Sequence, residues 1–93
     1  MNHSIYFVYI VECSDQTLYT GIARDLSARI EEHNSSSKGA KYTSGRRPVT
    51  LVYQKQVASR GEALKLEHQL KRLSRSQKND LIKNQERVTE LAE

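Results

Sequence analysis

The chain has little of several residue types that define common protein classes. It contains no tryptophan, one cysteine and one proline, and no apolar run approaches the roughly 20 residues of a membrane-spanning helix. The single cysteine, Cys13, cannot form an internal disulfide or supply a zinc site of several thiolates. No basic residue precedes the first apolar stretch, as a signal peptide would require. We therefore expect a cytoplasmic protein that does not associate with membranes.

The composition is that of a small globular domain. Of the 93 residues, 37% are hydrophobic and 28% charged, a balance that allows one packed core. We expect a single domain over residues 1–84, which we take to be a monomer. The apolar pattern thins after Lys83, so residues 85–93 are predicted to form a frayed C-terminal tail.

The positive charge is unevenly distributed. The net charge is +4, yet residues 1–23 contain no Lys or Arg. Between Lys38 and Lys83 basic side chains far outnumber the three acidic ones, Glu62, Glu67 and Asp80. Such a field attracts polyanions and is typical of phosphate-backbone binding, although a solvated helix face with an adjacent loop would give the same pattern. The basic residues that we expect to contact nucleic acid are Lys38, Lys41, Arg46, Arg47, Lys71, Arg72 and Arg75.

Three segments are predicted to be β-strands. Residues Tyr6–Val11 are apolar on both alternating faces, which indicates a central strand covered on both sides. After the turn residues 14–16, the segment Leu18–Ile22 predicts the second strand of an antiparallel hairpin. The third strand follows Pro48, with Val49, Leu51, Tyr53 and Val57 on one half-buried face.

The remaining segments are predicted to be helices and one loop. Asp25 is the predicted N-cap of a helix, and the polar stretch Asn34–Pro48 is predicted to be a long loop. Capping boxes at residues 59–62 and 74–77 predict two C-terminal helices, the second a short one reaching Ile82. The order β-β-α-β-α-α gives an α+β fold, a small three-stranded antiparallel sheet flanked by helices.

Glu67 is an acidic residue on a predicted apolar helix face. At about 100° per residue it falls within the arc of Ala63, Leu66 and Leu70. A partly desolvated carboxylate there needs a cation, a metal or a hydrogen-bond donor. The simpler alternative is a position at the edge of the stripe, paired with Lys71 one turn later.

Four further residues are candidates for a site, each with an ordinary structural alternative. His33 lies on the helix face of Leu26 and Ile30, where a buried histidine is usually structural, and Arg29 flanks that face. Tyr9 and Tyr19 lie in the two strands of the hairpin, where tyrosine is common in packing. A hairpin that turns about Ser14 would make the two rings cross-strand neighbours, with both hydroxyls near one point.

Taken in order, five short motifs resemble the GIY-YIG nuclease domain, in particular its small single-domain branch. The resemblance runs from about Ile5 to Ile82, with Phe7 where the motif name has Gly and Thr20 where it has Ile. The matching segments are Phe7-Val8-Tyr9, Tyr19-Thr20-Gly21, the helix residues 28–34 with Arg29, the loop residues 38–43 and 46–49, and the helix residues 62–67 with Glu67.

The resemblance implies a metal-dependent endonuclease that hydrolyses DNA phosphodiester bonds, in repair or recombination. In that family's pattern Glu67 binds one divalent cation, Mg²⁺ or Mn²⁺, and Arg29 clamps the phosphate. Tyr19, with Tyr9 beside it, orients or deprotonates the attacking water, and His33 carries a proton or orients a neighbour. The substrate is expected to be structured, single-stranded or duplex DNA.

Two other functions remain open from the residues alone. A nucleic-acid-binding module without turnover would bind DNA or RNA in a salt-dependent way, indifferent to Glu67 and to metal. A structural or protein-interaction domain with a basic face would not bind nucleic acid at physiological salt.

Overall fold

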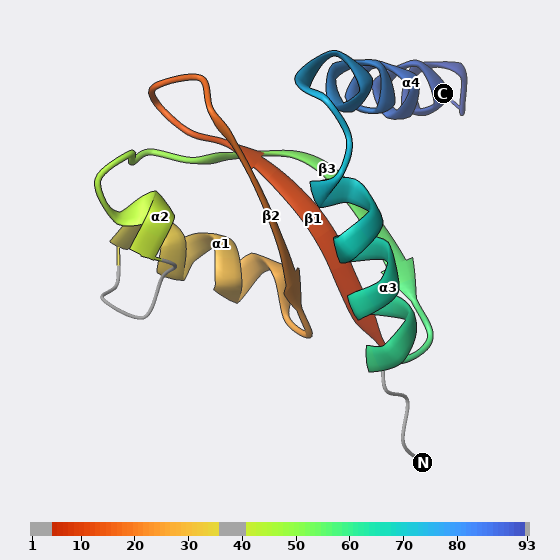
Figure 1. The fold of residues 1–93 in the computed structure, drawn as a ribbon, viewed down its shortest axis with the longest axis horizontal. Helices are drawn as coiled ribbons and strands as arrows, with labels where there is room; N and C mark the ends of the chain where they lie inside the picture. The colour runs from red at the N-terminus through yellow and green to blue at the C-terminus, as the bar shows by residue number, and fades with distance from the viewer. Residues whose placement is uncertain (1–4, 36–40, 93) are drawn as a thin grey trace.

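The structure, a computed structural model, describes residues 5–35 and 41–92 of the chain. The described residues form an α+β fold in which one antiparallel sheet lies between helices, as expected (Figure 1). The sheet order is β2-β1-β3, so the apolar strand β1 is central, as its sequence predicts. The elements are β1 (Tyr6–Glu12), β2 (Leu18–Ala23), α1 (Leu26–Ser35), α2 (Lys41–Ser44), β3 (Thr50–Val57), α3 (Arg60–Lys71) and α4 (Arg75–Ala92).

The three helix starts predicted from the sequence are confirmed. The Asp25 carboxylate accepts a hydrogen bond from the Ala28 N–H at 3.1 Å, which caps α1. Ser59 caps α3 by accepting from the Glu62 N–H at 3.1 Å. Ahead of α4, Ser74 and Gln77 exchange reciprocal hydrogen bonds, of 3.1 Å and 2.9 Å, in a complete capping box.

The sheet separates two cores. On the side of α3 and α4, the core consists of Val8, Ile10, Tyr53, Ala63 and Leu70. On the side of α1, it consists of Tyr9, Val11, Cys13, Ala23 and Val49. Successive residues of β1 therefore serve opposite cores, because side chains alternate across a strand. Figure 1 shows α1 and α3 on either side of the strands.

The predicted third strand is confirmed, but a bulge interrupts its predicted alternation. Ile10 pairs with Tyr53, but the next residue of β1, Val11, pairs with Leu51, so Val52 is an extra residue in β3. Such a bulge changes the face on which the following residues lie. Tyr53 therefore packs on the α3 side, whereas Leu51 packs on the α1 side. The strand also begins at Thr50, two residues after Pro48.

Two other segments are more helical than predicted. Asn34 and Ser35 belong to α1, and within the expected loop Lys41–Ser44 form the one-turn helix α2, whose Thr43 hydrogen-bonds His33 of α1. Helix α4 continues to Ala92, past the expected end at Ile82. Its Gln85 amide bonds both the N–H and the C=O of Gln54, at 3.0 Å and 2.7 Å, and so covers part of the β3 edge.

Candidate active site

The site begins with a tyrosine lying across a glycine. Tyr9 on β1 is paired with Gly21 on the edge strand β2. A Cβ at Gly21 would lie 2.5 Å from the Tyr9 hydroxyl and 2.7 Å from Cζ, so the ring occupies the space that a side chain would need. The glycine is therefore required by close approach, and it lets the Tyr9 ring cross β2 in a fully buried position.

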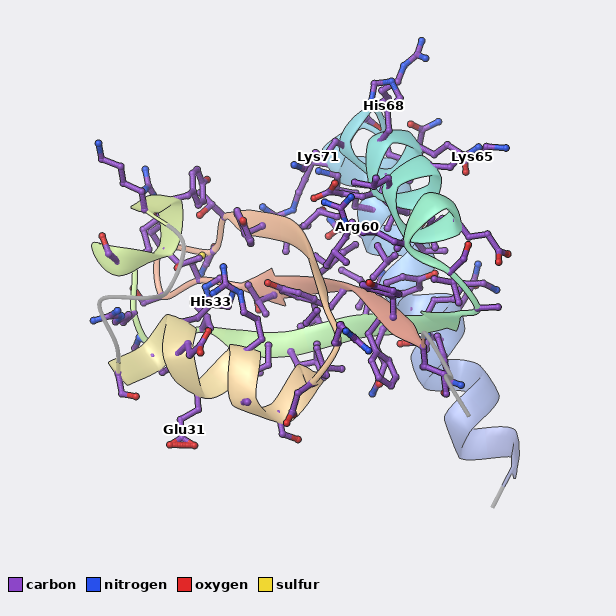
Figure 2. The ribbon with its side chains drawn as sticks, turned by 90° about the horizontal axis from the view of Figure 1, so that it is seen from below. Glu31, His33, Arg60, Lys65, His68 and Lys71 are labelled. Atoms are coloured by element: carbon purple, nitrogen blue, oxygen red, sulfur yellow. The ribbon has the colours of Figure 1, made fainter. Side chains whose placement is uncertain are left out.

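A chain of hydrogen bonds links Tyr9 to α1 and α2. The Tyr9 hydroxyl lies 2.7 Å from Nε2 of His33, and Nδ1 of His33 lies 2.8 Å from Oγ1 of Thr43. All three side chains are buried. In Figure 2, His33 points from α1 toward the strands, whereas Glu31 on the same helix points away from them. A buried polar network of this kind is stable only because its members satisfy one another.

Arg29 joins this cluster from the preceding turn of α1. Its guanidinium forms an ion pair with Glu32 at 2.9 Å, and its positive charge acts on Tyr9. Burial raises the pKa of Tyr9 to about 12, although the Arg29 contact acts in the opposite direction. Burial also lowers the pKa of His33, and the neighbouring Arg29 charge lowers it further. At neutral pH the site therefore holds a neutral tyrosine, a neutral histidine and a cation.

Tyr19 lies on the same face but not directly opposite Tyr9. Its partner in the register is Val11, two residues further along β1, so the predicted cross-strand pair is a diagonal one. Both rings contact His33 edge-on, with centroid distances of 5.8 Å for Tyr9 and 5.4 Å for Tyr19. The outer face of Tyr19 stacks on the exposed ring of Tyr42, at a centroid distance of 5.8 Å.

Glu67 approaches the site from α3. Its side chain is 21% exposed, and its carboxylate pairs with Lys71 at 3.2 Å, as the simpler interpretation of the sequence predicts. Its charge nevertheless reaches Tyr9, whose pKa is raised chiefly by burial and, by a small further amount, by Glu67. Helix α3 packs on β2, the strand that the Tyr9 ring crosses.

The segment between α2 and β3 is fastened to α1 beside the site. The Asn34 amide bonds both backbone groups of Val49, at 2.6 Å and 3.1 Å. Arg47 donates to the main-chain oxygen of His33 through its Nε. At the hairpin, Arg46 pairs with Asp15 at 3.0 Å and lies 4.1 Å over the Tyr42 ring. These contacts fix the position of Thr43 relative to His33.

Comparison with known proteins shows the family. The family model of the GIY-YIG catalytic domain matches residues 5–80, which is most of the chain. The chain belongs to the GIY-YIG family. It is 54% identical over 82 residues to a UPF0213 protein of Desulfotalea psychrophila, covering 88% of this chain and 74% of that one. It is 55% identical to a UPF0213 protein of Staphylococcus aureus, covering 84% and 94%.

Solved structures agree with this GIY-YIG fold. The solution NMR structure of a UPF0213 protein from Bacillus halodurans has a TM-score of 0.55 at 44% identity and covers 85% of this chain and 83% of its own. That of a protein from E. faecalis has a TM-score of 0.61 at 35% identity, covering 89% and 88%.

The two departures from the GIY-YIG motif lie outside the hydrogen-bonded cluster. Phe7 is half-buried, pairs with Ala23 and lines a hollow of about 740 Å³ together with Ile30 and Leu51. Thr20 faces α3, opposite the tyrosines, and its buried hydroxyl has no hydrogen-bond partner. Neither side chain hydrogen-bonds Tyr9, His33 or Arg29.

The donor set of the GIY-YIG site suits an oxygen-preferring cation with few protein ligands. Within residues 5–35 and 41–92 no cluster of three or more acidic, histidine or cysteine side chains is arranged for a metal. Mg²⁺ usually keeps several waters and binds through one or two carboxylates, which a single partly exposed carboxylate such as Glu67 can provide. The residues present therefore fit such an ion, provided that Lys71 gives up its contact.

Some of the basic side chains predicted to bind nucleic acid are exposed, whereas others already bond groups within the protein. Lys41 and Arg72 are exposed, and Lys71 is half-exposed on α3 (Figure 2). Arg75 donates to the Gln16 carbonyl at 2.6 Å. Like Arg46 and Arg47, it has a partner within the protein. Lys38 lies outside the described residues. None of the helices in the described part is long and apolar enough to cross a membrane.

Sequence reasoning did not single out Thr43, Asn34 or Tyr42 as parts of the GIY-YIG site. Their partners are 10 residues away for Thr43 and 15 for Asn34, across a segment without hydrophobic periodicity. No local pattern predicts such contacts. The one available signal was that Asn34 and residues 42–43 lie inside segments resembling family motifs.

Proposed function

We propose that this protein is a divalent-metal-dependent endonuclease that hydrolyses DNA phosphodiester bonds at the cluster of Tyr9, Tyr19, Arg29, His33 and Glu67. The observation that carries the proposal is the convergence of a buried Tyr9–His33 hydrogen bond, a cationic Arg29 and the nearby charge of Glu67. A domain that only binds nucleic acid has no need of a buried tyrosine–histidine pair. Membership of a nuclease-type family supports the same conclusion.

Arg29 is the proposed phosphate clamp. Its side chain is partly exposed and is held by its ion pair with Glu32, so its direction is set before substrate binds. A guanidinium is planar, permanently charged and able to bond two phosphate oxygens at once. Its charge stabilises the negative charge that grows on the phosphate oxygens as the attacking oxygen approaches.

The two tyrosines have separate proposed roles. Tyr9 remains protonated at neutral pH because its pKa is about 12, so by itself it is a hydrogen-bonding group rather than a base. Tyr19 is half-buried and lies between His33 and Tyr42, where its hydroxyl can orient the attacking water. Neutral His33, bonded to Tyr9, can receive a proton that the pair takes up during the reaction.

Glu67 is the proposed metal ligand. A divalent cation held there would neutralise phosphate charge and lower the pKa of a bound water. Lys71, when it releases Glu67, is free to contact the flanking phosphates with Arg72 and Lys41, and the remaining basic side chains add a general positive field. The segment carrying Lys38 is included in this proposed interface on its sequence alone.

Cleavage assays with defined DNA test the proposal. The purified protein is incubated with branched, single-stranded and duplex DNA, with Mg²⁺, with Mn²⁺ or with a chelator. We expect cleavage only with metal, and a fall of at least about 100-fold in Glu67→Gln and in Tyr19→Phe, the scale of losing a charge-stabilising or proton-handling group. Undiminished cutting by both variants would refute the assigned roles.

Matched controls come from the same helices. Glu31→Gln removes an exposed carboxylate of α1 that points away from the strands, and His68→Gln removes an exposed imidazole of α3 (Figure 2). Both should cleave at the rate of the unmodified protein. Metal-independent, salt-sensitive DNA binding without cleavage would instead identify a binding module.

A further inference from the structure

Thr43 is a buried hydroxyl whose position determines the chemistry of a neighbouring group. Its Oγ1 lies 2.8 Å from Nδ1 of His33, and Nε2 of the same ring lies 2.7 Å from the Tyr9 hydroxyl. A neutral imidazole has one nitrogen that donates and one that accepts. The hydrogen bonds at the two nitrogens therefore decide which of them carries the proton.

Burial sets the direction of this chain of hydrogen bonds. A buried hydroxyl proton needs an acceptor, and the Arg29 guanidinium, whose charge lowers the pKa of Tyr9, can only donate. Tyr9 is too deeply buried to give its proton to solvent. The proton is directed at Nε2 of His33, which must be unprotonated to accept it. The ring proton consequently lies on Nδ1, facing Thr43.

We propose that Thr43 is a positioning residue that holds neutral His33 in its Nδ1–H tautomer, so that Nε2 accepts the hydroxyl proton of Tyr9. In the opposite tautomer, Nε2–H would itself donate to the Tyr9 oxygen. The Tyr9 proton would then have no acceptor in the buried cluster. The catalytic consequence of this assignment rests on the proposed nuclease function, whereas the tautomer itself does not.

The position of Thr43 does not depend on its own hydrogen bond. Two other contacts hold the segment between α2 and β3 against α1. The Asn34 amide bonds the backbone of Val49, and Arg47 donates to the main-chain oxygen of His33. Both contacts would remain when the Thr43 hydroxyl is removed. Thr43→Val, which keeps the shape of the side chain, should therefore change the hydrogen bond without releasing α2.

Nitrogen chemical shifts of the histidine rings test the assignment directly. In ¹⁵N-labelled protein above pH 7, where His33 is neutral, we expect a protonated Nδ1 and an unprotonated Nε2, with the resonance identified by its loss in His33→Asn. Thr43→Ser should keep this pattern, and Thr43→Val should give a mixture or the opposite tautomer. The exposed ring of His68 should be the same in every variant.

Several results would overturn the proposal. A protonated Nε2 in the unmodified protein contradicts it at once, and so does an unchanged His33 pattern in Thr43→Val. If Thr43→Val does not fold, the same measurement is made on Thr43→Ala. That variant also removes the hydroxyl but adds no methyl group in its place.

Cleavage kinetics then separate this inference from the proposed function. Thr43→Val should lower kcat about 10-fold, the scale of one misdirected hydrogen bond, with KM unchanged and activity retained in Thr43→Ser. If the unmodified protein cleaves no DNA, the proposed function fails while the tautomer assignment stands. If Thr43→Val changes tautomer yet cleaves normally, the positioning role is refuted.

Discussion

The two faces of the sheet are built from different kinds of side chain. On the α1 face the buried core contains Tyr9, His33 and Thr43, joined by hydrogen bonds of 2.7 Å and 2.8 Å. On the α3 face the core is formed chiefly by aliphatic residues such as Ile10 and Leu70. Burying polar groups costs free energy unless they are paired, and an aliphatic core avoids that cost. A polar core on one face is therefore evidence that its residues serve more than packing.

The two faces also differ in the hydrogen bonding of a buried threonine. Thr43 is fully buried and hydrogen-bonded, whereas Thr20, also buried, leaves its hydroxyl without a partner. The first hydroxyl orients an imidazole, and the second has no such contact. Matched substitutions on the two faces test whether the polar side chains of the α1 face have a role beyond packing that those of the α3 face lack.

The largest effect is expected where the polar face meets β2. In Gly21→Ala the new Cβ would lie 2.5 Å from the Tyr9 hydroxyl, so the buried ring must move and its hydrogen bond to His33 breaks. We expect a loss of about 3 kcal/mol in the free energy of unfolding, measured by urea titration.

Gly45→Ala provides the matched control for this change. No atom lies within 4 Å of the point that a Cβ would occupy at Gly45, so the unfolding free energy should change by less than about 0.5 kcal/mol. Equal losses in the two variants would show that the contact with Tyr9 does not explain the need for Gly21.

The same substitution on opposite faces should have opposite signs. Thr43→Val leaves Nδ1 of buried His33 without its partner and should lower the unfolding free energy by about 2 kcal/mol. Thr20→Val removes a hydroxyl that has no partner and should raise it by about 1 kcal/mol. Urea titrations of the two variants check this, and a destabilised Thr20→Val would mean that the Thr20 hydroxyl is bonded.

Sequence reasoning succeeded where structure depends on close neighbours in the chain. The caps at Asp25, Ser59 and Ser74 rest on residues three apart, and the apolar run of β1 is enough to make it the central strand. The bulge at Val52 could not be predicted in this way, because it depends on pairing with β1, a strand far earlier in the chain. Helix α2 could not be predicted either. It packs beside α1 through a contact between Thr43 and His33, and such a contact produces no hydrophobic periodicity in the sequence.

The candidate site was predicted unevenly for the same reason. His33 and Glu67 could be identified because each is a polar residue at helical spacing with apolar residues. The roles of Tyr9 and Tyr19 could be predicted only from the family motif. The partners that orient them, Thr43 and Asn34, lie where hydropathy carries no signal. Local patterns thus indicate reactive groups, but their supporting contacts appear only when the chain is folded.

A smaller effect is expected from acid. Burial, with the Arg29 and Arg47 charges, lowers the pKa of His33 in the folded protein, while Glu32 acts in the opposite direction. In the unfolded chain the pKa of a histidine is about 6.5. As the pH falls through this value, the unfolded chain takes up a proton that folded His33 does not yet bind, so stability that is present above pH 6.5 is lost. Between pH 7.5 and 5.5 the loss of unfolding free energy from this group is at most about 1.4 kcal/mol, the limit set by proton uptake of the unfolded chain.

Two histidine variants isolate that contribution. In His33→Gln the part of the pH dependence between pH 7.5 and 5.5 that comes from this group should disappear, whatever the variant's absolute stability. His68→Gln, which changes an exposed ring, should keep the slope of the unmodified protein. Equal slopes in all three proteins would indicate that the pKa of His33 is the same in the folded and unfolded states.

The smallest effect is expected on the α3 side, at Gly61 in the first turn of α3. A Cβ there would approach only the Ser59 hydroxyl, at 3.9 Å, which is ordinary contact. Alanine restricts the unfolded chain and suits a helix better than glycine, so Gly61→Ala should raise the unfolding free energy by about 0.5 kcal/mol. DNA cleavage should be unaffected, since Gly61 contacts none of the polar cluster. An added methyl group is thus expected to stabilise α3 and to disrupt β2 at Gly21, because only Gly21 lies beneath the Tyr9 ring.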